Sequence, residues 1–76
     1  MDISNYNVQI KRHVFARAMY RGIHPDFIED TLRKGICIRF GKHGVKFINL
    51  GSKKTIICVG EIVGMTIKII TIEEGN

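Results

Sequence analysis

The hydrophobic periodicity of the chain changes at Gly35, and this change most narrows the folds open to it. Before Gly35, from Arg12 onward, apolar residues recur every three or four positions, as on one face of a helix. After Gly35 they alternate with other residues, as on one face of a strand. The sequence therefore predicts an α+β domain in which two helices at the N-terminal end precede a sheet.

The first predicted helix begins at Lys11 or Arg12 and ends after Tyr20, because Gly22 can adopt the left-handed conformation of a helix cap. On a helical wheel one arc of this segment is apolar and the opposite arc is polar. The arc expected to be buried holds Val14, Phe15, Ala18 and Met19. The polar arc holds His13, Arg17, Tyr20 and Arg21.

The second predicted helix spans 25–34 and has strong signals at both ends. Pro25 suits the first helical position, and acidic residues follow in the first two turns, where they complement the helix dipole. Two basic residues precede Gly35, which ends the helix. His24 is expected to occupy the cap position and bond the backbone. The predicted buried side holds Phe27, Ile28, Thr31 and Leu32.

Four strands are predicted after the helices, at 36–40, 45–50, 54–59 and 65–72, with turns at 41–44, 51–52 and 60–64. Gly51-Ser52 is a favoured two-residue hairpin loop. Because the connections are short, we expect a four-stranded antiparallel meander with the two helices packed on one face. The whole chain, 1–76, is expected to be one domain with a core of about 10–72, a short extended arm at 6–10, and frayed ends at 1–5 and 73–76.

A predicted register assigns the two faces of this sheet. If Phe40 is opposite Val45, and Phe47 and Ile69 are opposite Ile56, nine residues face the helices. They are Ile36, Ile38, Phe40, Val45, Phe47, Ile56, Cys58, Ile67 and Ile69. The other face then carries three basic residues, Arg39, Lys46 and Lys68, and six aliphatic residues, Ile48, Leu50, Ile57, Val59, Ile70 and Ile72.

Six large aliphatic side chains on one side of a small sheet exceed what a lone soluble domain normally exposes. The pattern therefore predicts that a homodimer or another protein partner covers part of this face, which makes these six residues candidate interface residues. Two alternatives stay open. The N-terminal arm could cover the face, or one strand could have a slipped register.

Composition limits the classes of function. Twelve Lys and Arg against seven Asp and Glu give a net charge of +5, which suits a polyanionic partner such as nucleic acid and also occurs in ordinary basic domains. No apolar run approaches the ~20 residues of a bilayer span, and no signal peptide is visible, so a cytoplasmic protein is expected. Cys37 and Cys58 lack zinc-site spacing, as do the three histidines, so we expect no metal and no cofactor.

The polar arc of the first helix carries the residue types of a metal-independent ribonuclease. His13, Arg17, Tyr20 and Arg21 follow the spacing i, i+4, i+7 and i+8 and form one strip. An imidazole can exchange a proton with a ribose hydroxyl, guanidinium groups can hold the scissile phosphate, and a phenol can contact a base or ribose. The alternative is that the strip is a solvated or structurally bonded helix face.

The order of these residues resembles a family of small, largely uncharacterised domains grouped with barnase, EndoU, colicin ribonucleases and the RelE/ParE-like toxins. The resemblance covers about residues 10–72. It rests on three motifs in order, His13-x3-Arg17-x3-Arg21-Gly22-Ile23, Pro25-x2-Ile28-x3-Leu32-x2-Gly35 and the last strand at 66–71. It implies a RelE-like fold, RNA cleavage without a metal, and an antitoxin partner.

Three hypotheses follow. The leading one is a toxin-type endoribonuclease in which His13 is the general acid or base, Arg17 and Arg21 clamp the phosphate, and Tyr20 contacts a base or ribose. Three further basic residues would bind the RNA backbone, namely Arg39, Lys46 and Lys68. The second hypothesis is a noncatalytic dimeric interaction module with the same fold. The third is a domain that binds RNA without cutting it.

Overall fold

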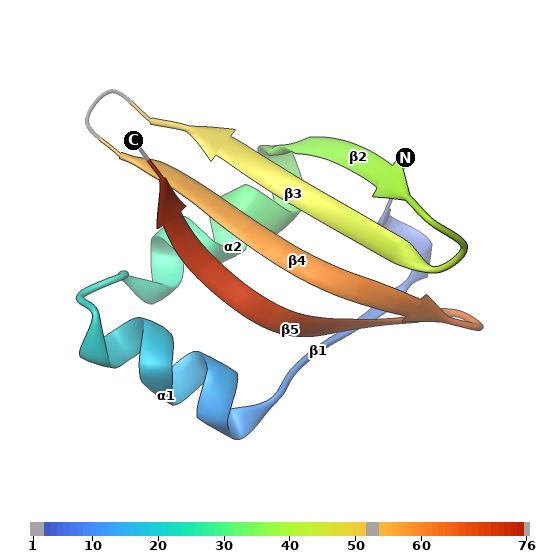
Figure 1. Cartoon of the computed structure of the whole chain (residues 1–76), viewed down its shortest axis with the longest axis horizontal. Coiled ribbons are helices and arrows are strands. Elements are labelled where there is room, and N and C mark those ends of the chain that lie inside the picture. Colours follow the sequence, from blue (N-terminus) through green and yellow to red (C-terminus); the bar gives the residue numbers. More distant parts are fainter. Residues whose placement is uncertain (1–2, 52–53, 76) are drawn as a thin grey trace.

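The described part of the chain contains two α-helices and a five-stranded mixed sheet (Figure 1). This computed structural model describes residues 3–51 and 54–75. A short 3-10 helix, Ile3–Asn5, comes first. The other elements are β1 (Asn7–Ile10), α1 (Arg12–Tyr20), α2 (Pro25–Lys34), β2 (Ile36–Phe40), β3 (Gly44–Leu50), β4 (Thr55–Val63) and β5 (Thr66–Gly75). The α+β class expected from the periodicity is confirmed.

The sheet has the strand order β1-β5-β4-β3-β2. The four strands β2 to β5 form the predicted antiparallel meander. The prediction of four strands is wrong by one, because the expected arm is strand β1, which pairs in parallel with β5 through Val8 opposite Ile67 and Ile10 opposite Ile69. Two parallel strands must be joined by a long crossover connection, and between β1 and β5 this connection consists of all the elements from α1 to β4.

Both helices pack into a single core with the sheet, α1 along β5 and α2 across β3 and β4. The predicted caps are confirmed, since Gly22 has a φ of +82° and the His24 ring nitrogen Nδ1 accepts from the Asp26 N–H at 3.1 Å. Two predicted core positions are wrong: Phe15 and Phe27 are 37% and 55% exposed. In each helix these rings lie at the margin of the apolar arc, next to a residue that is buried.

The predicted register of β2 is wrong by one residue. Phe40 is opposite Gly44 rather than Val45, because the turn has three residues, 41–43. A one-residue slip moves every side chain of a strand to the other face. Ile36 and Ile38 therefore lie with Phe40 on the face away from the helices, while Cys37 and Arg39 lie on the helix side.

The pairing of β4 and β5 also differs from the prediction. The segment expected to form a turn, 60–64, belongs mostly to β4, and the turn is at Gly64 and Met65. The expected frayed end continues β5 to Gly75. The predicted loop Gly51-Ser52 extends beyond the described residues at Ser52. The Gly51 N–H donates to the Lys54 carbonyl at 2.9 Å.

A bulge between Val59 and Gly60 on β4 makes Ile70 the extra residue on β5. The side chains of β5 therefore change face at Ile70, and Ile72 is buried at 5% exposure instead of lying on the predicted interface. Phe47 is opposite Cys58 and Ile56 is opposite Glu74, so these two predicted pairings are wrong. The predicted faces of Phe47, Ile56 and Ile69 are right. The partner of Phe47 is shifted by two residues along β4 and that of Ile69, which is Gly60, by four, and even shifts preserve the face.

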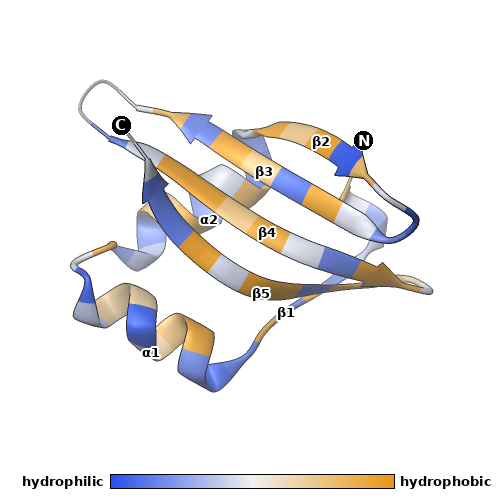
Figure 2. Cartoon of the chain, in the orientation of Figure 1, coloured by the Kyte–Doolittle hydropathy of each residue, from blue (hydrophilic) through white to orange (hydrophobic). Residues whose placement is uncertain are grey.

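Hydrophobic residues recur along strands β2 to β5 (Figure 2), and the two faces of the sheet differ in how far these residues are buried. We call the face away from the helices the outer face. The core on the helix side holds Val14, Ala18, Ile23, Ile28, Val45, Phe47, Ile56, Cys58, Ile67, Ile69 and Ile72. The outer face carries the partly or largely exposed Ile36, Ile38, Phe40, Ile48, Leu50, Ile57 and Val59. Neither helix in the described ranges has the length and apolar character of a membrane span.

Candidate functional site

A polar groove lies between α1 and the second half of β5. Because β1 pairs with β5 only up to Ile69, the edge of β5 beyond that residue carries no strand on this side in the described chain. Helix α1 runs beside this open edge (Figure 1). The hollow between them, which we call the α1–β5 groove, has a volume of about 190 Å³. Its lining residues are His13, Val14, Arg17, Arg21, Ile70, Thr71, Ile72 and Glu73.

Three of the four predicted catalytic residues line this groove together. His13, Arg17 and Arg21 are spaced four apart, so they project from successive turns of α1 on one side. Tyr20 does not line it. On the helical wheel it lies on the far side of His13 from the buried Val14, and it is 95% exposed. The expected contact of Tyr20 with a substrate at this site therefore has no support from the geometry.

Glu73 is the residue that the sequence prediction missed. We expected it in a frayed end, but β5 continues through it and Glu73 lines the groove with His13. Glu73 is opposite Ile57 on β4, so it borders the groove from the outer side of the open edge. Among the groove residues it supplies the one carboxylate. No apolar residue follows Ile72, so the hydrophobic pattern carries no signal for a strand that continues through Glu73.

None of the four ionisable groove side chains, His13, Arg17, Arg21 and Glu73, has a hydrogen bond or ion pair to another described residue. All four side chains are exposed, so they are solvated rather than bonded within the fold. The groove thus presents a proton donor or acceptor, a second acceptor and two guanidinium forks to a ligand.

The predicted RNA-binding basic residues do not extend this groove. Lys46 and Lys68 lie on the outer face as expected. The Lys46 ammonium lies over the Phe40 ring, 5.6 Å from its centroid. Arg39 lies on the opposite face from the one predicted, a consequence of the slipped register of β2. The structure does not bring these three residues together with His13.

The other histidines and the cysteines have structural surroundings. His24 caps α2, with Nδ1 3.7 Å from an Asp26 carboxylate oxygen, and His43 is exposed in the β2–β3 turn. Cys58 is fully buried, and burial raises the pKa of its thiol to about 12. Across residues 3–51 and 54–75, no three His, Cys, Asp or Glu side chains gather as a metal-binding group.

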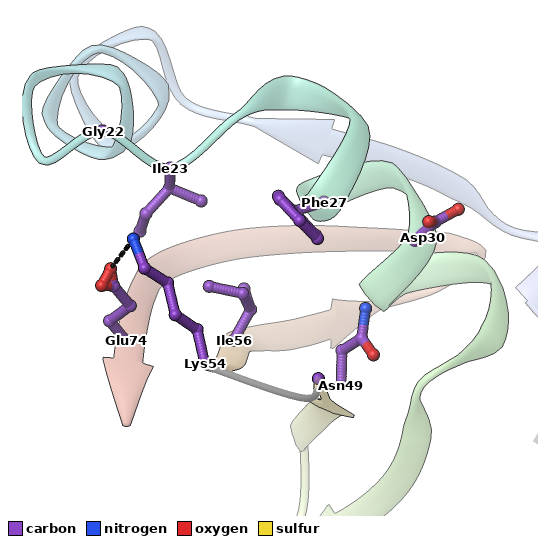
Figure 3. A pocket seen from close by; sticks show the side chains of 9 residues that line it. Gly22, Ile23, Phe27, Asp30, Asn49, Lys54, Ile56 and Glu74 are labelled. Atoms are coloured by element: carbon purple, nitrogen blue, oxygen red, sulfur yellow. Dashed lines mark ion pairs between the residues drawn. The ribbon is translucent and has the colours of Figure 1, made fainter. Parts of the chain in front are cut away.

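A second hollow lies between the start of α2 and the ends of β3, β4 and β5 (Figure 3). We call it the Phe27 pocket, and its volume is about 370 Å³. Figure 3 shows the Phe27 ring and the Ile56 side chain directed into it, with Lys54 reaching across to Glu74. The Lys54 Nζ to Glu74 Oε1 distance is 3.3 Å. The remaining lining residues are Gly22, Ile23, Asp30, Asn49 and Gly51.

The groove and the pocket meet at the corner between the helices. Arg21 lines the groove and the next residue, Gly22, lines the pocket. In the same way Glu73 lines the groove and Glu74 lines the pocket. Successive Cα atoms are ~3.8 Å apart, so one nucleotide is long enough to reach from one hollow into the other.

The arrangement can hold an anion against two guanidinium groups while an imidazole and a carboxylate exchange protons with it. The adjoining apolar hollow offers a flat aromatic surface for a ring on the same ligand. Comparisons of the chain with protein-family models, curated proteins and solved structures give no significant match.

Proposed function

We propose that this protein is an endoribonuclease of the toxin type that cleaves RNA without a metal ion, with the α1–β5 groove as its active site. The observation that most supports this is the grouping of His13, Arg17, Arg21 and Glu73 in one groove, without internal bonds that would occupy them. A fold with RelE-like character, as the motif at 13–23 implies, is part of the same proposal.

The proposed reaction is an internal transfer at the RNA phosphate. The ribose 2′-oxygen attacks the adjacent phosphorus, and its proton passes to the Glu73 carboxylate. The bond from phosphorus to the 5′-oxygen breaks, and protonated His13 gives its proton to that oxygen. The products are a 2′,3′-cyclic phosphate and a free 5′-hydroxyl. No water enters and no charge is lost, so the step balances.

Arg17 and Arg21 have the electrostatic role in this proposal. Negative charge grows on the nonbridging oxygens as the phosphorus becomes five-coordinate, and guanidinium forks held in place stabilise that charge more than they stabilise the starting diester. Their position on one side of a helix that packs on the core keeps the two forks in fixed relation to His13.

The Phe27 pocket would receive the base of the nucleotide being cut. Stacking of a base on an aromatic ring tolerates sequence variation and adds affinity without base-specific bonds. In this proposal Phe27 takes the role that the sequence analysis gave to Tyr20, because Phe27 borders a hollow next to the groove and Tyr20 does not.

The test is incubation of the purified protein with a defined single-stranded RNA in EDTA, followed by mass spectrometry of the fragments. We expect fragments ending in 2′,3′-cyclic phosphate, and we expect His13→Ala to abolish them while leaving the circular dichroism spectrum unchanged. The matched control is His43→Ala, which removes an exposed imidazole far along the chain in a turn. Intact RNA with the unmodified protein would overturn the proposal.

A second candidate is a noncatalytic interaction module, and the exposed apolar outer face favours it. Its partners would be a second copy of the chain or an antitoxin. If the protein binds RNA in the same assay but leaves it intact, the third hypothesis, an RNA-binding domain, replaces both the nuclease and the interaction module. Full RNA binding by the His13→Ala variant would agree with this third hypothesis.

A further inference from the structure

A third hollow lies where β1 ends and the chain turns into α1. We call it the Lys68 hollow, and its volume is about 420 Å³. Its lining residues are Gln9 and Ile10 at the end of β1, Lys11, and Lys68 on β5. None of these residues lines the α1–β5 groove, so the Lys68 hollow is a separate one.

The lining of the Lys68 hollow is cationic and includes no carboxylate. Lys11 and Lys68 are exposed, and neither ammonium group has an ion pair or hydrogen bond to another described residue, although Glu61 is opposite Lys68 on β4. The Phe27 pocket differs, because two carboxylates, Asp30 and Glu74, line it. A phosphate therefore suits the Lys68 hollow, whereas an uncharged base suits the Phe27 pocket.

The three hollows follow one another in the same order along α1 and along β5. On the helix side the lining runs from Lys11, through groove residues between 13 and 21, to Gly22. On the strand side it runs from Lys68, through 70–73, to Glu74. Residues 68–74 of a strand span ~20 Å at ~3.3 Å per residue. Stacked nucleotides advance only ~3.4 Å each, so a ligand that fills all three hollows is an oligonucleotide.

The proposed reaction gives this row of hollows a direction. Glu73, which takes the proton of the 2′-oxygen, is next to Glu74 of the Phe27 pocket, where the base of the same nucleotide lies. His13, which gives its proton to the 5′-oxygen, is two residues from Lys11 and so lies toward the opposite end of the groove. The leaving strand begins at this 5′-oxygen, and it therefore continues toward the Lys68 hollow.

We propose that the Lys68 hollow binds the first phosphate on the 3′ side of the cut. The substrate is then single-stranded RNA that runs 5′ to 3′ from the Phe27 pocket to Lys68, since a base held in that pocket cannot also be paired. The direction rests on the proposed function, whereas the phosphate site rests on the charges of the hollow. Lys11 and Lys68 add affinity for the leaving strand and take no part in the proton transfers.

Short substrates with a phosphate added at one end test the site and its direction. The reference is a dinucleoside monophosphate, NpN, whose single phosphate is the scissile one and whose bases are taken from a sequence that the protein cuts. A phosphate on the 3′ end, as in NpNp, should lower KM at least tenfold. A phosphate on the 5′ end, as in pNpN, should change KM less than twofold. A larger gain from the 5′ phosphate, or cleavage of NpN with no gain from either, would overturn the proposal.

Charge-removing variants assign this gain to the two lysines. In the double variant Lys11→Gln with Lys68→Gln, the KM for NpNp should rise to the value for NpN. Both side chains are exposed, so we expect the variant to fold. The matched control is Lys46→Gln, which removes a charge from the outer face beside Phe40 and should keep the full gain. An equal loss in this control would mean that the overall charge of the protein, and not the hollow, attracts the phosphate.

Binding without cleavage separates this inference from the proposed function. A labelled single-stranded oligodeoxynucleotide has no 2′-oxygen and cannot undergo the transfer. The logarithm of its binding constant should fall with the logarithm of salt concentration by ~0.7 per phosphate neutralised, so the double variant should have a slope shallower by about 0.7. The slope of Lys46→Gln should be unchanged. Equal slopes for the double variant and the unmodified protein would overturn the phosphate site even if RNA is cut. Intact RNA together with a shallower slope would overturn the proposed function and the direction, and leave the phosphate site.

Discussion

The two margins of the sheet carry opposite chemistry. At the margin formed by β5 and α1, four ionisable side chains line a groove and none of them is bonded to another described residue. At the other margin β2, which has no strand beyond it within residues 3–51 and 54–75, exposes three large apolar side chains. One margin therefore offers charged groups, and the other offers an apolar surface.

This difference indicates what each margin binds. Charged groups left unpaired on a rigid helix suit a small charged ligand that arrives and leaves. Exposed apolar side chains suit a permanent neighbour, because their burial is favourable whatever the solution contains. A molecule built this way has room for a substrate on one side and for a protein partner on the other, with the two strands β4 and β3 between them.

The largest effect on RNA cleavage should come from a substitution of Glu73, the groove residue that sequence analysis missed. Glu73→Gln keeps the shape of the side chain but removes its ability to take a proton, and loss of a general base usually costs about 10²–10⁴-fold in rate. We expect RNA cleavage to fall by that factor when initial rates are measured on a short oligonucleotide.

The matched control for this prediction is Glu74→Gln. Glu74 is the next residue, pairs with Lys54 and borders the Phe27 pocket instead of the groove. We expect its cleavage rate to stay within a few-fold of the unmodified protein. Equal losses for the two variants would mean that negative charge at the end of β5, rather than a positioned carboxylate, supports the activity.

A smaller effect is expected on RNA binding when the aromatic ring of Phe27, which borders the Phe27 pocket, is removed. Stacking of one base on an aromatic side chain contributes ~1–3 kcal/mol, so Phe27→Ala should weaken binding of single-stranded RNA by roughly 5- to 150-fold. Tyr20→Ala removes an even more exposed aromatic ring, outside both hollows, and should leave the dissociation constant unchanged. Fluorescence anisotropy with a labelled oligonucleotide measures both; a larger loss for Tyr20→Ala would place the base beside α1 instead.

The local features of this chain were predictable because they depend on neighbouring residues. The cap at His24, the proline that starts α2 and the glycine after α1 act over a few residues, and all three are as predicted. The meander follows from short connections between alternating segments. The positions of His13, Arg17 and Arg21 in one groove follow from helical spacing alone.

The features that sequence reasoning missed depend on pairing between distant segments. One residue fewer in the turn after Phe40 reversed the faces of β2, and one extra residue at Ile70 reversed the faces of the end of β5. The parallel pairing of β1 joins residues about sixty positions apart. Glu73 was missed for a related reason, since its place beside the groove depends on how far β5 continues past Ile69, where β1 stops pairing with it.

The free energy of unfolding should depend on alkaline pH through the thiol of Cys58, which lies in the core between the two margins. Because burial raises the pKa of Cys58 to about 12, the unfolded chain loses this proton near its ordinary pKa of 9.0 while the folded chain keeps it. Stability is therefore greatest below pH 9 and falls as the pH rises toward 12, by about 1.4 kcal/mol per pH unit from this group. Urea unfolding from pH 8 to 11 should be less pH-dependent in Cys58→Ala than in the unmodified protein; identical slopes would show that the thiol ionises equally in both states.

The smallest expected effect is that of a substitution at the β2 margin on cleavage at the other margin. If the two margins act separately, Ile38→Lys should leave the RNA cleavage rate within twofold, because β2 is separated from β5 by β3 and β4. Initial rates of this variant and of the unmodified protein, measured at the same RNA concentration, provide the check. A loss of cleavage in a variant whose circular dichroism spectrum is unchanged would mean that the β2 margin shapes the groove through the sheet, and the two margins would then be parts of one site.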